Sequence, residues 1–316
     1  MNYSLNALYQ ELGTSKQAVH LSKKRHMAFD KDLCVLVKAA DVLKREHPGC
    51  GVEKMYYTLK PKTMGRDKFC EIFLSLGYGV KKVKNYRRTT VLGHMSYPNL
   101  IAGLELDSPG RVLQSDITYF ELNRTHCYLV FILDIYTREI IGYHAGDHLR
   151  TQANLKALET ALANIEISAQ GLIHHSDRGS QYASNCYRNK LKEKGIQISM
   201  GLTALENAYA ERVNRIIKNE YLSLWDIKDL NDLKRKTKRA VEHYNTKRKH
   251  RGHQMKYTPQ EFKQMWLHLD PQHRPKMTIY SEAKTNLIGA SSPNEISPRA
   301  EPQAPICPMD FNLVLT

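Results

Sequence analysis

Residues 171–182 read GLIHHSDRGSQY, an apolar run that passes into polar residues and then into a Gly-Ser turn. A short buried strand that ends at the edge of a sheet has this pattern. We therefore predict that Asp177 lies at the end of a strand, where its carboxylate is presented at the sheet edge.

A second segment, residues 206–218, has the residue spacing of an amphipathic helix. At about 100° per residue, polar side chains gather on one predicted face and apolar side chains on the opposite one. The polar face carries Glu211 with Asn207, Asn214 and Lys218, and the apolar face carries Tyr209, Val213, Ile216 and Ile217. Glu211 is thus predicted to point away from the buried side of its helix.

A third acidic residue changes the interpretation of the first two. An arbitrary strand-end Asp and helix Glu are ordinary surface residues in roughly nine cases of ten. Asp116, however, stands in the middle of the β-rich run VLQSDITYF at residues 112–120. A mid-strand Asp is disfavoured unless something requires it, so the three acids are interpreted together.

Three carboxylates at one sheet edge repel one another, and their pKa values rise unless a cation lies between them. Mg²⁺ prefers oxygen ligands and is commonly held by carboxylates together with substrate phosphate oxygens. Two such ions can promote an in-line displacement at phosphorus. Asp116, Asp177 and Glu211 therefore predict a site for Mg²⁺ or Mn²⁺, with two ions, and phosphoryl transfer on a nucleic acid.

The sequence resembles a known family at these three blocks. Residues 116–119 (DITY), 175–182 (HSDRGSQY) and 207–211 (NAYAE) are similar to the motifs of the DDE transposases, which are related to retroviral integrases. More narrowly, they resemble the second-reading-frame (OrfB) transposases of bacterial insertion sequences of family three. The resemblance extends from about residue 30 to about residue 265 and depends on motif order and spacing.

The resemblance implies DNA strand cleavage and strand transfer at the ends of an insertion sequence, with Asp116, Asp177 and Glu211 as the catalytic triad. It implies that Asn214, Arg215 and Lys218 hold the DNA end. Arg178 is expected either to do likewise or to form a structural salt bridge. The implied partners are double-stranded DNA, as terminal repeats and target, further copies of the chain assembled on that DNA, and an upstream-frame (OrfA) protein.

The chain departs from the family pattern at three places. Sixty residues separate Asp116 from Asp177 and 33 separate Asp177 from Glu211, which is two fewer than is usual for the second gap. The shortening falls in the loop at residues 201–204. Leu113 stands where a Trp is usual, and Glu206 where an Asp is usual. These departures are interpreted as variation in a loop and in packing.

The order of predicted elements indicates an α/β ribonuclease-H-like, or integrase, core. Three successive strands are followed by alternating helices and strands, which is typical of a mixed sheet with helices on both faces. The predicted strands are 112–120, 128–133, 139–143, the run that ends at Asp177, and 196–199; the predicted helices are 151–166, 181–194 and the Glu211 helix. Asp134 falls in a turn between strands and needs no chemistry to explain it.

The core is predicted to be flanked by an all-α helix-turn-helix region and a basic helical C-terminal extension. The predicted organisation is a helical hairpin at 1–28, a helix-turn-helix region at 29–80, a basic linker at 81–110, the catalytic core at 111–225, the basic extension at 226–268 and a disordered tail at 269–316. The tail prediction depends on its many prolines.

Composition indicates a polyanionic partner. The 316 residues carry a formal net charge of +15, so nucleic acid is the first candidate and an anionic membrane surface the second. No apolar run reaches the length of a membrane span, and no Cys-x-x-Cys pair indicates a zinc site. We expect a cytoplasmic, nucleoid-associated bacterial protein without a membrane partner.

Two basic segments are predicted to contact the DNA backbone. The linker concentrates positive charge within eight residues, and residues 228–256 hold 11 Lys and Arg against three Asp and Glu. Such clusters suit contact with phosphates, although a solvated charged surface is the alternative. The candidate contacts are Lys81, Lys82, Lys84, Arg87 and Arg88 in the linker and Arg248 and His250 in the extension.

Two other functions remain open from the sequence. A hydrolytic nuclease of the ribonuclease-H type would use a carboxylate on the first core helix, a position that Glu159 could take, but the face of Glu211, Asn214 and Lys218 would then be unexplained. A transposase remnant could bind DNA without cutting it, and the intact set of three acids argues against this.

Overall fold

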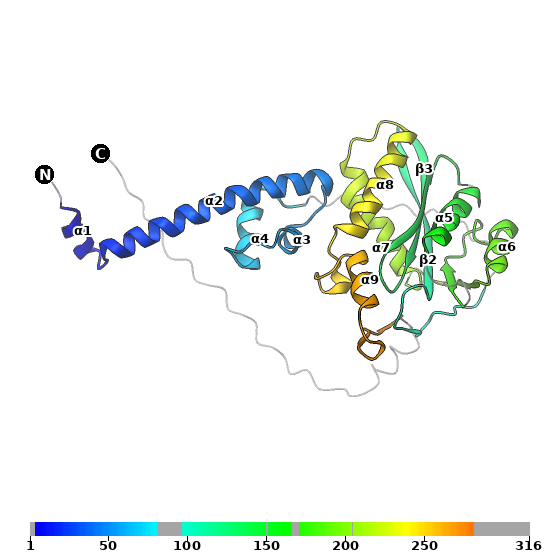
Figure 1. Cartoon of the computed structure of the whole chain (residues 1–316). Helices are drawn as coiled ribbons and strands as arrows, with labels where there is room; N and C mark the ends of the chain where they lie inside the picture. The colour runs from blue at the N-terminus through cyan, green and yellow to red at the C-terminus, as the bar shows by residue number, and fades with distance from the viewer. Residues whose placement is uncertain (1–3, 81–96, 150, 166–170, 204, 281–316) are drawn as a thin grey trace, which may run out of the picture. The chain divides into compact units, whose positions relative to one another are not determined.

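The computed structural model describes residues 4–80, 97–149, 151–165, 171–203 and 205–280 (Figure 1). The linker cations Lys81, Lys82, Lys84, Arg87 and Arg88 lie outside these residues. Within the described residues, no helix combines the length and apolar character that crossing a bilayer requires.

A five-stranded mixed sheet forms the centre of the fold. Its strand order is β4-β3-β2-β5-β6. Strand β3 runs antiparallel to both β2 and β4, whereas β2, β5 and β6 run parallel to one another. The strands are β2 (Val112–Leu122), β3 (Thr125–Asp134), β4 (Ile140–Gly146), β5 (Ile173–Ser176) and β6 (Gln197–Met200). This order confirms the prediction of three successive strands followed by crossover-connected ones.

Helices cover both faces of the sheet (Figure 1). On one face α5 (Thr151–Asn164) and α6 (Asn185–Glu193) bury Ala157, Leu158 and Leu191 against Leu113 and Ile132. Because successive strand residues point to opposite faces, the alternate strand residues are free to pack against helices on the other face. The ribonuclease-H-like fold class is thereby confirmed.

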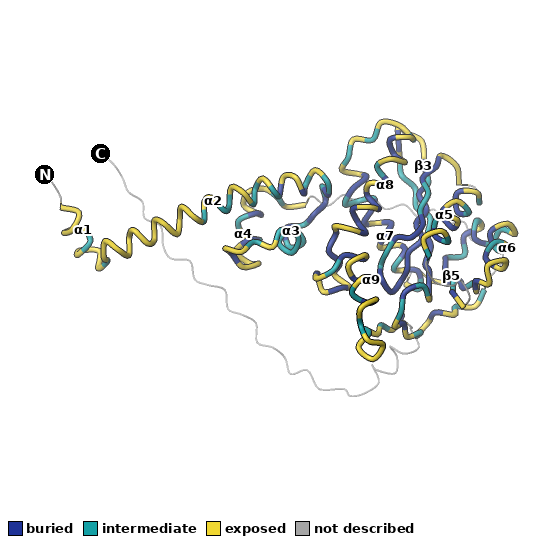
Figure 2. The backbone as a smooth tube through the Cα atoms, viewed as in Figure 1, coloured by how far each residue is buried: buried dark blue, intermediate teal, exposed yellow. Residues whose placement is uncertain are grey.

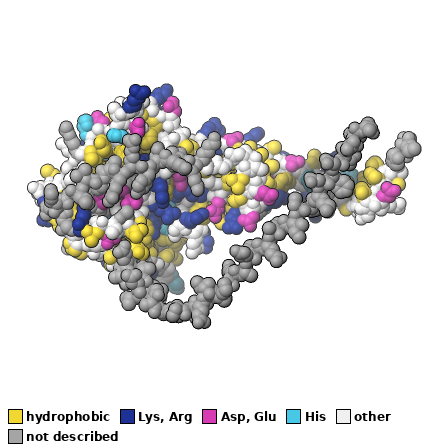
Figure 3. Space-filling view, turned by 180° about the vertical axis from the view of Figure 1, so that it is seen from behind, with side chains coloured by type: hydrophobic (Ala, Val, Ile, Leu, Met, Phe, Trp, Pro, Cys, Tyr) yellow, Lys and Arg dark blue, Asp and Glu magenta, His cyan; other side chains and the backbone are white. Residues whose placement is uncertain are grey.

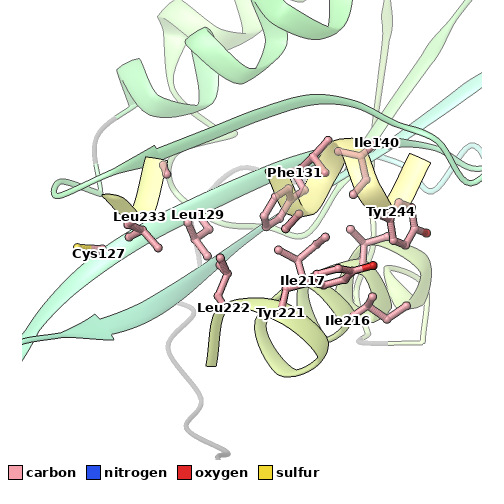
Figure 4. Close-up of a cluster of buried hydrophobic side chains, with 14 of the residues drawn as sticks. Cys127, Leu129, Phe131, Ile140, Ile216, Ile217, Tyr221, Leu222, Leu233 and Tyr244 are labelled. Carbon is pink, nitrogen blue, oxygen red and sulfur yellow. The ribbon is translucent and has the colours of Figure 1, made fainter. Parts of the chain in front are cut away.

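The second face packs against α7 (Ala208–Ile216) and α8 (Leu230–Thr246). Leu129 and Phe131 of β3 meet Ile217 and Tyr221, which follow directly after α7 (Figure 4). This segment, Ile217–Tyr221, is a π-helix, and Leu222–Leu224 continues it as one 3₁₀ turn. The burial of so many apolar side chains fixes α7 on the sheet, and with it the backbone of Glu211.

The N-terminal helices differ from the predicted hairpin. They are α1 (Leu5–Glu11), α2 (Lys16–Glu46), α3 (Val52–Leu59) and α4 (Arg66–Ser75). The predicted break at residue 28 is wrong, since α2 runs through it without interruption. No Gly or Pro occurs within α2, so nothing in its sequence stops a helix before the Pro48-Gly49 turn. Figure 2 shows that its first half is exposed on all sides.

The helix-turn-helix arrangement itself is present at the end of α2. Ala40 packs with Met55 of α3 and with Phe69 and Phe73 of α4, all fully buried. The rings of Phe69 and Phe73 stack at 4.1 Å. These helices have a hydrophobic core of their own, which favours their interpretation as a folded module.

The chain beyond α8 is folded further than predicted. After α9 (Pro259–Leu267), the strand β7 (Met277–Thr278) pairs with β1 (Glu105–Leu106). The Tyr136 hydroxyl donates to the Pro275 carbonyl at 2.6 Å, and Ile279 is buried. The prediction of a tail disordered from residue 269 is therefore wrong for residues 269–280, because apolar packing and strand pairing outweigh their proline content.

Candidate active site

Asp116 and Asp177 occupy neighbouring positions on two parallel strands. The pairing of β2 with β5 ends at Ser115 and Ser176, and the next residue on each strand is one of the two acids. Adjacent strands lie about 4.7–4.9 Å apart, so the register alone brings the two carboxylates to one edge. The predicted strand-end position of Asp177 is confirmed.

The Asp177 side chain is held by the turn that follows it. The backbone N–H of Gly179 donates to Asp177 Oδ1 at 3.0 Å. A Cβ atom on Gly179 would approach the same oxygen to 3.0 Å, which is tighter than an ordinary van der Waals contact. Glycine at this position therefore lets the turn close over the carboxylate.

Glu211 lies in the first turn of α7, whose start is fixed to β2 by side-chain amides. Gln114 accepts a hydrogen bond from the backbone N–H of Ala210 at 2.9 Å and donates to the carbonyl of Glu206 at 2.8 Å. Asn207 donates to the carbonyl of Ser115 at 3.2 Å. These bonds hold the helix start beside the strand that carries Asp116, while the Glu211 side chain itself is exposed.

The polar face of α7 lies along β2 at two further points. The Asn214 side chain donates to Asp116 Oδ2 at 2.8 Å, and Lys218 Nζ lies 3.4 Å from Thr118 Oγ1. The Lys218 ammonium also lies over the ring of Tyr119. Two of the three residues predicted to hold a DNA end, Asn214 and Lys218, are thus in contact with the strand of the first acid.

The three carboxyl groups influence one another electrostatically. Burial, followed by the charges of Asp177 and Glu211, raises the pKa of Asp116 well above its ordinary value. Burial also raises the pKa of Asp177, and burial together with Asp177 raises that of Glu211. Like charges that share a partly buried edge favour protonation or a bound cation.

The donor set fits a divalent cation. Three carboxylates supply only oxygen ligands, which Mg²⁺ and Mn²⁺ prefer. The pKa of Asp116 is raised first by burial and then by the charges of Asp177 and Glu211, and a cation would offset these charges. Across the described residues, however, no group of three or more His, Cys, Asp or Glu side chains is arranged so that it could hold a metal ion.

Two histidines of β5, the strand that precedes Asp177, have structural roles. His174 Nε2 lies 2.9 Å from the Tyr187 hydroxyl, and His175 Nδ1 lies 2.8 Å from Ser199 Oγ. Burial lowers the pKa of His174 to about 3 and that of His175 to about 4. Both side chains are neutral at physiological pH and position β5 rather than carry charge.

Sequence reasoning did not identify the supporting role of two polar residues in β2. Gln114 and Ser115 are both fully buried, and Ser115 Oγ lies 2.7 Å from the Tyr182 hydroxyl. A Gln-Ser pair inside an otherwise apolar strand was the available signal, because buried polar groups require partners. The interpretation of this strand was based on Asp116 and left out Gln114 and Ser115.

The residues that depart from the family pattern have clear structural places. Leu113 is fully buried beneath α5 and α6. Glu206 accepts hydrogen bonds from the backbone N–H groups of Leu202 and Thr203 and from Asn99. The longer Glu side chain thus ties the shortened loop to the start of α7.

The remaining residues that are predicted to contact DNA differ in how far their side chains are exposed to solvent. Arg215 is exposed and Arg178 partly buried. The Arg248 side chain is only 5% exposed and makes two hydrogen bonds to Glu220, at 2.8 and 2.9 Å. His250 is buried and accepts the Gly252 N–H. Figure 3 shows Lys and Arg side chains scattered among hydrophobic and acidic ones on the face of the molecule that it presents.

The structure also shows the surroundings of two acidic residues other than Asp116, Asp177 and Glu211. Asp134 is buried and accepts hydrogen bonds from Gly110 and from both the N–H and the hydroxyl of Thr137, which supports its interpretation as a turn residue. Glu159 is exposed on α5, and the carboxylates that raise the pKa of Asp116 are those of Asp177 and Glu211.

Comparison with known proteins gives two family matches. Residues 107–204 and residues 194–259 both match the integrase core domain. Together these segments cover β2 to the start of α9 and include all three acids.

Among relatives, a 31 kDa protein of insertion element IS600 from Shigella sonnei is 31% identical over 227 residues, which are 70% of this chain and 83% of that protein. The transposase of insertion sequence IS629 from Shigella sonnei is 33% identical over 144 residues, 45% of this chain and 48% of that one. The chain thus spans about half the length of the latter.

Among solved structures, the catalytic core domain of HTLV-2 integrase in complex with magnesium has a TM-score of 0.36 and 17% identity. The match covers 48% of this chain and 91% of that domain.

Proposed function

Because the chain belongs to the DDE transposases of bacterial insertion sequences, enzymes that catalyse DNA strand transfer, we propose that Asp116, Asp177 and Glu211 are its catalytic triad. The observation that carries this assignment is the pairing of β2 with β5, which brings Asp116 and Asp177 side by side at one sheet edge, where the charges of Asp177 and Glu211 both raise the pKa of Asp116. Groups with such perturbed pKa values gather at functional sites.

The proposed reaction has two displacements at phosphorus. Water first attacks the phosphodiester at the end of the element and frees a 3′-hydroxyl group. That hydroxyl then attacks a phosphodiester of the target DNA, so that one bond to phosphorus forms as another breaks. No covalent bond to the protein is needed, because the side chains align and stabilise the reacting groups.

The three carboxylates would hold two Mg²⁺ or Mn²⁺ ions. Bound there, such ions activate the attacking oxygen and stabilise the leaving one. Asn214 keeps one oxygen of Asp116 oriented through its 2.8 Å hydrogen bond. Gly179 does the same for Asp177, so that two of the three ligands are already oriented by neighbouring groups.

A hydrolytic nuclease of the ribonuclease-H type is the second candidate for the same fold. It would require Glu159 near the two aspartates, whereas the carboxylates that raise the pKa of Asp116 are those of Asp177 and Glu211. A DNA-binding protein without catalysis is also disfavoured, because the chain retains all three acids together.

The partners proposed are double-stranded DNA, comprising terminal repeats and target, and further copies of this chain assembled on that DNA. Two DNA ends must meet for integration, which favours an oligomer. An upstream-frame (OrfA) partner is also proposed. The net charge of +15 supports association with DNA and hence with the bacterial nucleoid in the cytoplasm.

The decisive experiment is a strand-cleavage and joining assay on terminal-repeat DNA, whose sequence is found by reading the DNA on both sides of the gene. We expect joined product with Mg²⁺ from the wild-type chain and none from Asp177→Asn. The exposed Asp226→Asn is the matched control and should retain activity. Cut product without joined product would favour the nuclease, and equal cutting by Asp177→Asn would reject the proposed triad.

A further inference from the structure

A carboxylate in the π-helical segment after α7 connects two parts of the chain. Glu220 accepts hydrogen bonds from Arg248, from Lys54 of α3 at 2.7 Å and from His47 at 2.8 Å. Although burial alone would raise the pKa of Glu220, the His47 hydrogen bond and the Arg248 charge hold it well below its ordinary range. The carboxylate is therefore ionised and fixed among cations.

The backbone approaches equally closely at this point. The Gly49 N–H donates to the Glu220 carbonyl at 2.8 Å. A Cβ atom on Gly49 would come within 2.4 Å of the Glu220 Cα, so that only glycine allows this contact. The turn between α2 and α3 is consequently held directly against the segment that continues α7.

This contact creates a groove that the proposed triad does not use. It has a cavity volume of about 410 Å³ and is bounded by α3, by α7 and by the loop after α8. Its charged lining consists of Lys54, Arg212, Arg215, Arg248, Arg251 and a single carboxylate, Glu220. Five cations around one anion leave an excess of positive charge in a concave site.

The partners of these cations show which charges are available. Arg248 and Lys54 are bound to Glu220, and Arg251 forms a 2.8 Å ion pair with Glu53. Arg212 and Arg215 are exposed and form no salt bridge with any described residue, although the charge of Arg215 lowers the pKa of Glu211, four residues earlier on the helix. The guanidinium groups of Arg212 and Arg215 thus line the groove without an ion pair in the described part of the chain.

Further evidence comes from the repulsion within the cluster. Burial, and after it the charge of Arg248, lowers the pKa of Arg212. His250 adds no charge, because burial and Arg248 lower its pKa to about 2. Cations that are held together against their mutual repulsion fit an anion that the folded protein does not itself supply.

The position of the groove identifies the anion. Arg212 follows Glu211 directly, and Arg215 lies one turn further along the same helix. Guanidinium groups donate two parallel hydrogen bonds to phosphate oxygens, a geometry that a DNA backbone offers repeatedly. A strand whose scissile phosphate reached Glu211 would pass this groove.

We propose that the groove lined by Arg212, Arg215 and Arg251 binds backbone phosphates of the DNA strand next to the scissile one, between the catalytic core and α3. This inference rests on the proposed function, because it takes DNA as the substrate. It adds Arg212 to the DNA contacts, and it assigns Arg248 and Lys54, through Glu220, and Arg251, through Glu53, to holding the groove together.

The test measures DNA binding by the full chain in EDTA, by fluorescence anisotropy of a labelled terminal-repeat duplex at several salt concentrations. Each lost phosphate contact lowers the slope of log K against log salt by about 0.9. We expect that decrease for Arg212→Ala and nearly twice as much for Arg212→Ala with Arg215→Ala. Lys192→Ala, an exposed cation on α6, is the matched control and should leave the slope unchanged.

Neutral methylphosphonate linkages locate the contact. One such linkage near the scissile phosphate should weaken binding of the wild-type chain and have little additional effect on Arg212→Ala. An unchanged salt slope in Arg212→Ala, or equal sensitivity of both proteins at every linkage, would overturn the inference. Selective binding of an acidic peptide that DNA cannot displace would overturn it too.

The two proposals fail separately, because this assay contains no metal and measures no chemistry. A wild-type chain that cuts and joins DNA while Arg212→Ala keeps its slope rejects the groove alone. Conversely, a decrease in slope in Arg212→Ala together with full cutting by Asp177→Asn rejects the triad alone.

Discussion

The side chain of Asn214 donates a 2.8 Å hydrogen bond to the carboxylate of Asp116, across 98 positions of sequence. This bond is among the contacts that lower the pKa of Asp116, opposing the larger effects of burial and of the other two acids. It therefore links the helix that carries Glu211 to the strand that carries the first acid.

Replacing Asn214 by Ala should reduce strand cleavage about tenfold, since a hydrogen bond to a charged group is worth roughly 1.5–3 kcal/mol. Loss of the bond raises the pKa of Asp116 further, so that a higher pH is needed to ionise it. The acidic limb of the pH–rate profile should move to higher pH. Asn231→Ala, at an exposed position of α8, is the control; an unmoved profile in Asn214→Ala would contradict the expectation.

Asp116→Asn should stabilise the metal-free protein at neutral pH while abolishing cleavage. The folded-state pKa of Asp116 is raised, so the folded chain binds more protons than the unfolded one and stability falls as pH rises through that window. We expect a higher free energy of unfolding than that of the wild-type chain, because the amide carries no charge that burial and the other two acids would destabilise. The side-chain amide introduced at position 116 can donate a hydrogen bond to the buried Oδ1 of Asn214, which has no partner among the described residues.

Thermal denaturation with and without Mg²⁺ checks this prediction. Added Mg²⁺ should raise the melting temperature of the wild-type chain, because a ligand of the folded state stabilises it. The response should be much smaller in Asp116→Asn. A variant that is less stable than the wild type in EDTA at neutral pH would count against the crowded-carboxylate interpretation.

Glu220→Ala should lower the free energy of unfolding by about 3–5 kcal/mol, because it leaves the buried Arg248 without its carboxylate. The pKa of Glu220 is depressed in the folded state. The stability that it contributes is therefore present above its ordinary pKa and lost as pH falls toward the depressed value. Urea denaturation measures the change. Exposed Glu242→Ala should cost less than about 0.5 kcal/mol, and similar losses in both variants would be evidence against the network.

Ile279→Ala should cost about 2–5 kcal/mol, as expected for a large-to-small change in a packed site. Ile279 is 4% exposed and belongs to the cluster that contains Trp266 and Phe262. The matched variant Leu267→Ala alters a side chain that is 51% exposed and should have a small effect. Equal denaturation midpoints for Ile279→Ala and the wild type would argue that the β1–β7 region contributes nothing to the fold.

The central strands could be predicted because their signals are local. The apolar runs of β2, β3 and β4 and the Gly-Ser turn after Asp177 have short-range periodicity that the folded chain keeps. The break placed at residue 28 was wrong because it followed from two separate runs of apolar spacing, and the tail begun at residue 269 was wrong for residues 269–280 because it followed from proline content. Continuity of α2 follows from the absence of any helix stop, and residues 269–280 are fixed by a distant partner, β1.

The sequence by itself determined the order of the core elements and singled out the three acids proposed as the triad, because strand periodicity, helix periodicity and motif spacing are properties of neighbouring residues. The tertiary structure alone decided that Gln114 and Asn207 fix the start of α7, that Asn214 binds Asp116, and that Arg248 is buried on Glu220. Each of these is a contact between distant segments. Which partner a polar side chain finds depends on where packing leaves it, and no local pattern records that.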